Sequence, residues 1–126
     1  MSSPPAARLA VAGTLALMLL ELLWELALAP LGGHASWLAL KALPLALLLP
    51  GIARGARVPR QWLALLLPFY AAEALVRSLD ETGRHAVVAA TVCAVATVTF
   101  VALLTWFRGA DAARGSCRGS APPRRR

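Results

Sequence analysis

Long blocks of apolar residues, separated by short polar segments, dominate this sequence. The first block, residues 9–29, is 21 residues long. As a helix rising about 1.5 Å per residue it reaches roughly 31 Å, which crosses a hydrocarbon core about 30 Å thick. Three further blocks follow at residues 37–52, 62–79 and 86–107, and the mean hydropathy of the chain is +0.65. The sequence therefore predicts an all-α membrane protein, a bundle of four transmembrane helices.

The segments outside these blocks complete the predicted organisation as a single domain. Residues 1–8 form a short lead, residues 51–61 an aqueous loop with three arginines, and residues 108–126 a disordered tail rich in Gly, Ser, Pro and Arg. The second span is short and contains Pro44 and Pro50. We therefore expect it to be kinked, to thin the local bilayer, or to borrow residues from its loops.

The basic residues predict the orientation of the bundle. The lead, the middle loop and the tail carry ten Lys and Arg residues, whereas the first and third connections carry one, Arg84. Short cytoplasmic segments carry the excess of positive charge in membrane proteins, so both termini are predicted to be cytoplasmic. Because topology explains the positive charge, a nucleic-acid partner is not predicted. The abundance of Arg and Ala is typical of a GC-rich genome and indicates a bacterial source.

Ionisable residues inside the predicted spans are the strongest candidates for a site, because charge within a bilayer is costly and needs a partner, a cavity or the interface. Five residues form this predicted polar cluster: Glu21, Glu25, Lys41, Glu73 and Arg77. Glu25 and Lys41 stand equally far from Gly33 and are predicted to lie level in the first hairpin. Glu73 and Arg77 are four residues apart and share one helical face.

Two interpretations of this polar cluster remain open, beside a third in which Lys41 and Arg77 only extend their charged ends to the membrane interface. In the first, its members are interhelical ties that fix the register and rotation of the helices. In the second, they line a pocket that opens outward and binds a solute, a lipid headgroup or a proton. Glu21 is the deepest charge, and three acids face two cations, so Glu21 is the acid that we expect to carry a proton.

Aromatic residues mark either the membrane interface or the packing between helices. The candidates are Trp24, Trp37, Trp62 and Tyr70. The two histidines, His34 and His85, fall in predicted turns near acidic residues, a position typical of solvated side chains, so no metal site is predicted. No cofactor motif, nucleotide-binding loop or catalytic triad is recognisable, and we expect the protein not to be an enzyme.

Several sequence strings resemble a family of small bacterial inner-membrane proteins, the domain of unknown function 2069. They include Leu23-Trp24-Glu25-Leu26, the run from Trp37 to Pro44 (WLALKALP), Gln61-Trp62, and Tyr70 with the segment from Glu73 to Arg77. The likeness covers roughly residues 9–107, and the Arg-rich tail lies outside it. The resemblance implies a four-helix membrane protein and supplies no activity, ligand or catalytic residue.

These observations favour a structural or accessory membrane protein whose first partner is the lipid bilayer. A second membrane protein or another copy of the chain is a further candidate partner. The alternative is a small proton-coupled transporter that works as an oligomer, because four-helix exporters also carry a glutamate in their first span. In such a transporter, however, Lys41 and Arg77 would neutralise acids that the mechanism needs, and the predicted cluster lies toward one face of the membrane instead of its midplane.

Overall fold

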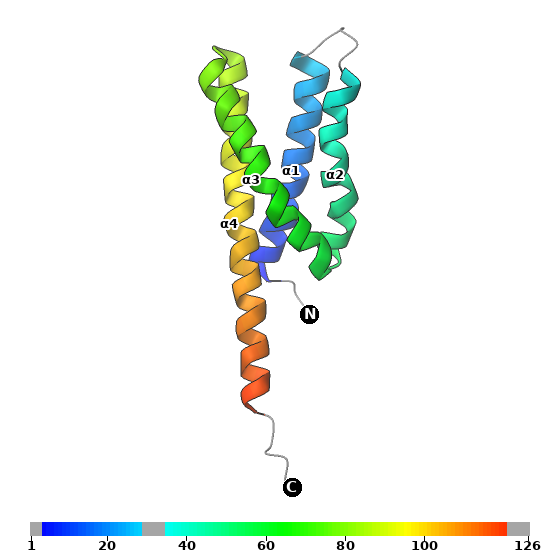
Figure 1. Ribbon diagram of the computed structural model, residues 1–126, viewed down its shortest axis with the longest axis vertical. Coiled ribbons are helices and arrows are strands. Elements are labelled where there is room, and N and C mark those ends of the chain that lie inside the picture. Colours follow the sequence, from blue (N-terminus) through cyan, green and yellow to red (C-terminus); the bar gives the residue numbers. More distant parts are fainter. Residues whose placement is uncertain (1–3, 29–34, 121–126) are drawn as a thin grey trace.

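Four helices that alternate in direction form the protein (Figure 1). In the computed structural model, α1 spans Pro5–Leu28, α2 Ala35–Ala53, α3 Arg57–Asp80 and α4 Arg84–Gly119. The structure describes residues 4–28 and 35–120, without the side chains of residues 25–28, 35–39 and 41. All regular secondary structure within these residues is helical. The prediction of an all-α fold is confirmed.

The helices form a closed ring in which each packs against two others. Neighbours along the chain pack together, and α4 returns to pack against α1. Within the described residues, the diagonal pairs α1–α3 and α2–α4 make no close backbone approach. The start of α1, the connection between α2 and α3, and the end of α4 lie at one end of the bundle, which we call the basic end (Figure 1). The connection between α3 and α4 lies at the opposite end.

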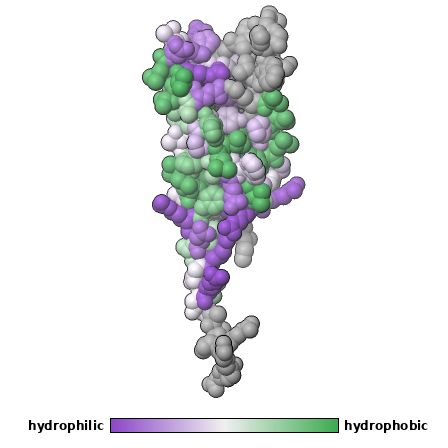
Figure 2. All heavy atoms as spheres, in the orientation of Figure 1, coloured by the Kyte–Doolittle hydropathy of each residue, from purple (hydrophilic) through white to green (hydrophobic). Residues whose placement is uncertain are grey.

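The interior is built from one stripe of residues on each helix, spaced three or four positions apart as helical periodicity requires. On α1 this stripe contains Ala7, Ala10, Thr14 and Leu17, and on α3 it contains Arg60, Leu63, Leu67, Tyr70 and Ala74. The outer surface is also apolar, with Phe69 74% and Leu79 80% exposed. Figure 2 shows apolar side chains along the middle of the bundle and polar ones toward its ends. A large exposed apolar surface of this kind matches a lipid solvent.

Three helices, α1, α3 and α4, are long and apolar enough to cross a membrane. The apolar part of α2 among the described residues, Ala42–Ala53, is shorter. As a whole α2 extends beyond the predicted residues 37–52 at both ends and reaches 19 residues, or about 28 Å at 1.5 Å per residue. The sequence allowed the short second block to borrow residues from its loops. The structure shows this, because α2 includes residues that were predicted to lie in loops.

The helices differ from the predicted spans mainly near the basic end. The structure continues α3 back to Arg57, so Arg57 and Arg60 belong to a helix and the predicted aqueous loop is correspondingly shorter. Pro59 does not prevent this, because a proline in the first turn removes an N–H that has no helical acceptor. The short connection that precedes α3 begins with a Schellman motif at the end of α2. Gly55 has a φ of 75°, and the N–H of Ala56 donates to the carbonyl of Gly51 at 2.9 Å.

The fourth helix is longer than its predicted span. The sequence predicted a disordered tail from residue 108, whereas α4 continues as a helix to Gly119. Residues 108–119 contain alanines and arginines, which are strong helix formers, and the first proline after the span is Pro122. The polar composition of this segment therefore does not prevent a helix. Residues 121–126 lie outside the described part of the chain.

Close contact between α1 and α4 depends on Gly13. A Cβ at this position would collide with Oγ1 of Thr99 on α4. Thr14 and Thr99 are both fully buried, and each hydroxyl donates to a carbonyl of its own helix, that of Ala10 or Val95, at 2.7 Å. Small residues with internally satisfied hydroxyls allow two backbones to approach closely, as is common between membrane helices.

Candidate functional site

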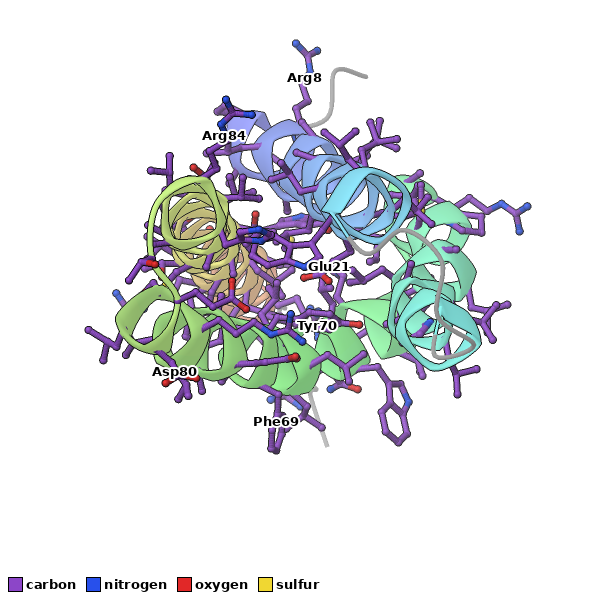
Figure 3. The ribbon with its side chains drawn as sticks, turned by 90° about the horizontal axis from the view of Figure 1, so that it is seen from above. Arg8, Glu21, Phe69, Tyr70, Asp80 and Arg84 are labelled. Carbon is purple, nitrogen blue, oxygen red and sulfur yellow. The ribbon has the colours of Figure 1, made fainter. Side chains whose placement is uncertain are left out.

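The interior stripes of α1 and α3 become polar at the end opposite the basic end. Glu21 and Trp24 continue the α1 stripe beyond Leu17, and Tyr70 and Arg77 lie on the α3 stripe. Seen down the bundle, Glu21 and Tyr70 both point into the interior from opposite helices (Figure 3). Together with Glu73, Ala74 and residues of α4 they line a cavity of about 20 Å³. We call Glu21, Trp24, Tyr70, Glu73 and Arg77 the interior polar cluster.

Arg77 is the centre of the contacts in this cluster. Its Nη2 lies 3.0 Å from Oε1 of Glu73, one turn earlier on α3. The same guanidinium lies 5.6 Å from the ring centroid of Trp24 on α1. A cation within about 6 Å of an aromatic ring is attracted to it, more strongly where water is excluded. Arg77 therefore joins a carboxylate of its own helix to an aromatic ring on the diagonally opposite one.

Trp24 also reaches α4. Its ring packs edge-on against that of His85 with centroids 5.8 Å apart. Nδ1 of His85 lies 3.9 Å from Oε2 of Glu81, too far for a hydrogen bond. That carboxylate oxygen is buried and has no hydrogen-bond partner among the described residues. The contacts of Trp24 thus link three helices at this end of the bundle.

Some side chains of the predicted polar cluster lie together in the structure, and the others are outside the described residues. Glu21, Glu73 and Arg77 come together, and Trp24 and Tyr70, predicted as packing or interface residues, join them. The side chains of Glu25, Lys41 and Trp37 are outside the described residues, so the predicted Glu25–Lys41 pair stays a prediction. Trp62 is 57% exposed on the outer face of α3, as a residue of the membrane interface would be.

The size of the cavity limits what it can hold. A volume of about 20 Å³ accommodates one water molecule and excludes an organic solute. Tyr70, only 7% exposed, brings a phenolic hydroxyl into this space from α3. Among the described residues, no group of three or more His, Cys, Asp or Glu side chains is arranged to hold a metal ion. In this conformation the cluster can bind water or a proton and can tie helices together.

Sequence reasoning missed a second interior charge, Arg60, at the basic end. Arg60 is only 6% exposed, and its guanidinium carbon lies 4.3 Å from the ring centroid of Trp106 and 5.4 Å from that of Phe107. Its Nε donates a hydrogen bond to the carbonyl of Ala56 at 3.2 Å. The signal was present, because position 60 precedes Leu63 and Leu67 at the spacing of the interior stripe. Assigning residues 51–61 to a loop concealed it.

Comparison with known proteins identifies a family and no characterised relative. The model of a family described as a predicted membrane protein, DUF2069, matches residues 9–110. This range contains the four blocks predicted as spans and the complete interior polar cluster. No curated protein and no solved structure matches the chain significantly.

Proposed function

The chain belongs to the DUF2069 family of predicted membrane proteins, and from this premise we propose that it is a non-enzymatic structural or accessory protein of a bacterial inner membrane. The interior polar cluster acts as a tie that fixes α1 against α3 across the bundle. A rigid bundle then presents a constant apolar surface to lipid and to a second membrane protein. The observation that carries this proposal is the position of Arg77 between Glu73 and the ring of Trp24.

The arrangement of the helices explains why such a tie is needed. Helices α1 and α3 face each other diagonally and make no close backbone approach within the described residues. In a membrane, moving an apolar side chain from lipid into a helix interface gains little free energy. Specific packing and polar contacts must therefore hold the helices together. Long side chains such as those of Arg77 and Trp24 can bridge a diagonal that small residues cannot. The cluster supplies this contact where direct backbone packing is missing.

Two features favour a tie over a transport site. The cavity beside the cluster is too small for an organic solute. The positive charge of Arg77 is engaged by both Glu73 and Trp24, so it is not held ready for a ligand. A transporter based on this cluster would have to open the bundle and break these contacts during each cycle.

A double-mutant cycle tests the tie directly. Trp24→Leu and Arg77→Gln are made singly and together, and the free energy of unfolding is measured for the full chain in detergent. If the two side chains stabilise the bundle jointly, we expect a coupling energy of about 0.5–2 kcal/mol. The control cycle pairs Trp24→Leu with Arg84→Gln, because Arg84 is an exposed arginine at the same end. Equal coupling energies in both cycles would contradict the proposal that Trp24 and Arg77 hold α1 against α3.

The accessory role is tested by recovering the protein with its neighbours. The full chain is crosslinked in native membranes, purified in mild detergent, and the covalently attached proteins are identified. Recovery in a complex of defined composition supports an accessory role. Recovery only as a dimer of identical chains contradicts it and favours a transporter that works as an oligomer.

One observation keeps the proton-coupled transporter as a second candidate. Glu21 lies in the interior beside the water-sized cavity and points toward Tyr70, an arrangement through which a proton could move (Figure 3). If Glu21 carries protons for transport, Glu21→Gln leaves the unfolding temperature close to that of the wild type and abolishes proton-driven solute uptake into proteoliposomes. Asp80→Asn, at an exposed acid outside the interior polar cluster, serves as the control. Wild-type coupling in the Glu21→Gln protein would eliminate Glu21 as the proton carrier.

A further inference from the structure

A groove at the basic end lies between α1 and the end of α2, far from the interior polar cluster. Its volume is about 640 Å³, within the range of roughly 300–1,000 Å³ that small-molecule sites occupy in proteins. The residues that matter here are Arg8, Val11 and Leu15 of α1, Ala53 and Arg54 at the end of α2, and Trp106 of α4. Three helices therefore contribute to one concave surface.

The groove is cationic at its rim and apolar along its wall. Arg8 and Arg54 are exposed, and Arg8 extends away from the bundle (Figure 3). Val11 and Leu15 continue along α1 from Arg8 toward the middle of the bundle, and Leu15 lies about 10 Å beyond Arg8 at 1.5 Å per residue. A ligand that fits both parts has an anionic head and an apolar chain.

A buried charge behind Trp106 adds to the positive potential of the groove. Arg60 covers one side of the Trp106 ring at 4.3 Å, and the charges of Arg57 and Arg114 also act on Arg60. Among the described residues, no carboxylate lies within salt-bridge distance of Arg60. Aromatic rings and one backbone carbonyl thus stabilise Arg60 without cancelling its charge. The wall of the groove consequently favours an anion.

We propose that this groove binds an anionic phospholipid of the surrounding bilayer. The phosphate lies between Arg8 and Arg54, and one acyl chain follows Val11 and Leu15 along α1. A phospholipid whose headgroup also carries a positive charge binds more weakly, because the two arginines repel that charge. The inference rests on the chain spanning a membrane and is independent of the proposed tie, which lies at the other end of the bundle.

Lipid titrations of the purified full chain test the site. The unfolding temperature in a nonionic detergent is followed as phosphatidylglycerol, phosphatidylcholine or glycerol phosphate is added. We expect phosphatidylglycerol to raise it at the lowest concentration, since only this probe has both the anionic head and the acyl chains. Basic residues near an anionic lipid surface contribute about 1 kcal/mol each, so Arg8→Gln with Arg54→Gln should weaken phosphatidylglycerol binding roughly 30-fold.

Matched variants separate the groove from the general positive charge of the protein. Arg108→Gln with Arg118→Gln removes the same net charge from exposed positions of α4 that do not line the groove, and it should weaken binding less than about threefold. Ala53→Trp fills the groove without changing its charge and should also weaken binding. Leu65→Trp, on the exposed face of α3, is its control. All four positions or pairs are exposed, so the variants should fold, as their unfolding temperatures without lipid will establish.

Three results would overturn the proposal. The first is equal affinity for phosphatidylcholine and phosphatidylglycerol, which would show that the arginines do not select an anion. The second is an equal effect of the Arg8/Arg54 pair and the Arg108/Arg118 pair, or of Ala53→Trp and Leu65→Trp. The third is saturation by glycerol phosphate at the concentration that suffices for phosphatidylglycerol, which would identify a soluble phosphate ligand instead of a lipid.

Discussion

At the scale of single residues, the fold stabilises its interior arginines with aromatic rings. Arg60 lies over Trp106 and Phe107 at the basic end, and Arg77 lies over Trp24 at the opposite end. The planar, delocalised guanidinium can stack on a ring while its N–H groups donate elsewhere. This pairing lets Arg60 lie between helices with no carboxylate within salt-bridge distance among the described residues.

Arg60 and Arg57 make a matched pair for measuring this effect. Both are in the first turn of α3, but Arg60 is 6% exposed and Arg57 is exposed to solvent. We expect Arg60→Gln to lower the free energy of unfolding by about 1–2 kcal/mol, since it loses the cation–π contacts and leaves a polar amide in the interior. Arg57→Gln should change it by less than about 0.5 kcal/mol. Thermal unfolding in detergent measures both, and equal losses would contradict the assigned role of the rings.

At the scale of helices, the packing of α1 on α4 depends on a contact that tolerates no extra atom. Gly13→Ala places a methyl group against Thr99, and we expect it to destabilise the bundle by about 1–3 kcal/mol. Adding Thr99→Ala makes room for this methyl group and should recover part of the loss in a thermal unfolding measurement. Gly109→Ala is the control, because a Cβ there meets no neighbouring atom. If Gly13→Ala proved as stable as this control, the helices would be farther apart than described.

The extension of α4 beyond the bundle is a second property of one helix. Ala112→Pro should break the helix near Arg108, because proline lacks the N–H donor and clashes with the carbonyl four residues earlier. We expect trypsin to cleave at Arg114 and Arg118 faster in this variant, while the unfolding temperature of the bundle stays unchanged. Ala112→Gly, which weakens a helix by only about 1 kcal/mol, should have a smaller effect. Cleavage at the same rate in all three proteins would indicate that the segment is not helical in solution.

At the scale of the whole molecule, the native cysteines allow the predicted orientation in the membrane to be measured. Cys117 is an exposed native thiol on the α4 extension, and Cys93 can be replaced by Ala to leave it as the single reporter. We expect a membrane-impermeant maleimide to label Cys117 in inverted membrane vesicles and not in intact spheroplasts. A cysteine introduced at Thr82, in a protein lacking both native cysteines, should show the opposite pattern. Labelling of Cys117 in intact spheroplasts would reverse the proposed topology.

Much of the molecule follows from the sequence because two simple physical constraints act locally. The length of each apolar block must match the bilayer, so the helical class and the approximate helix positions could be predicted. The cost of charge in lipid selects residues that need partners, which identified Glu21, Glu73 and Arg77. Helical spacing alone placed Glu73 and Arg77 within reach of one another, and the structure has them 3.0 Å apart.

Only the tertiary structure decided which helices meet and which side chains cross between them. The ring order of the four helices makes α1 and α3 diagonal neighbours, and this arrangement brings Trp24 to Arg77 and Glu21 to Tyr70. The burial of Arg60 and the groove between α1 and α2 were equally hidden, since both depend on packing by α4. Contacts between distant segments depend on how the helices tilt and rotate against one another. The local periodicity of a sequence does not contain that information.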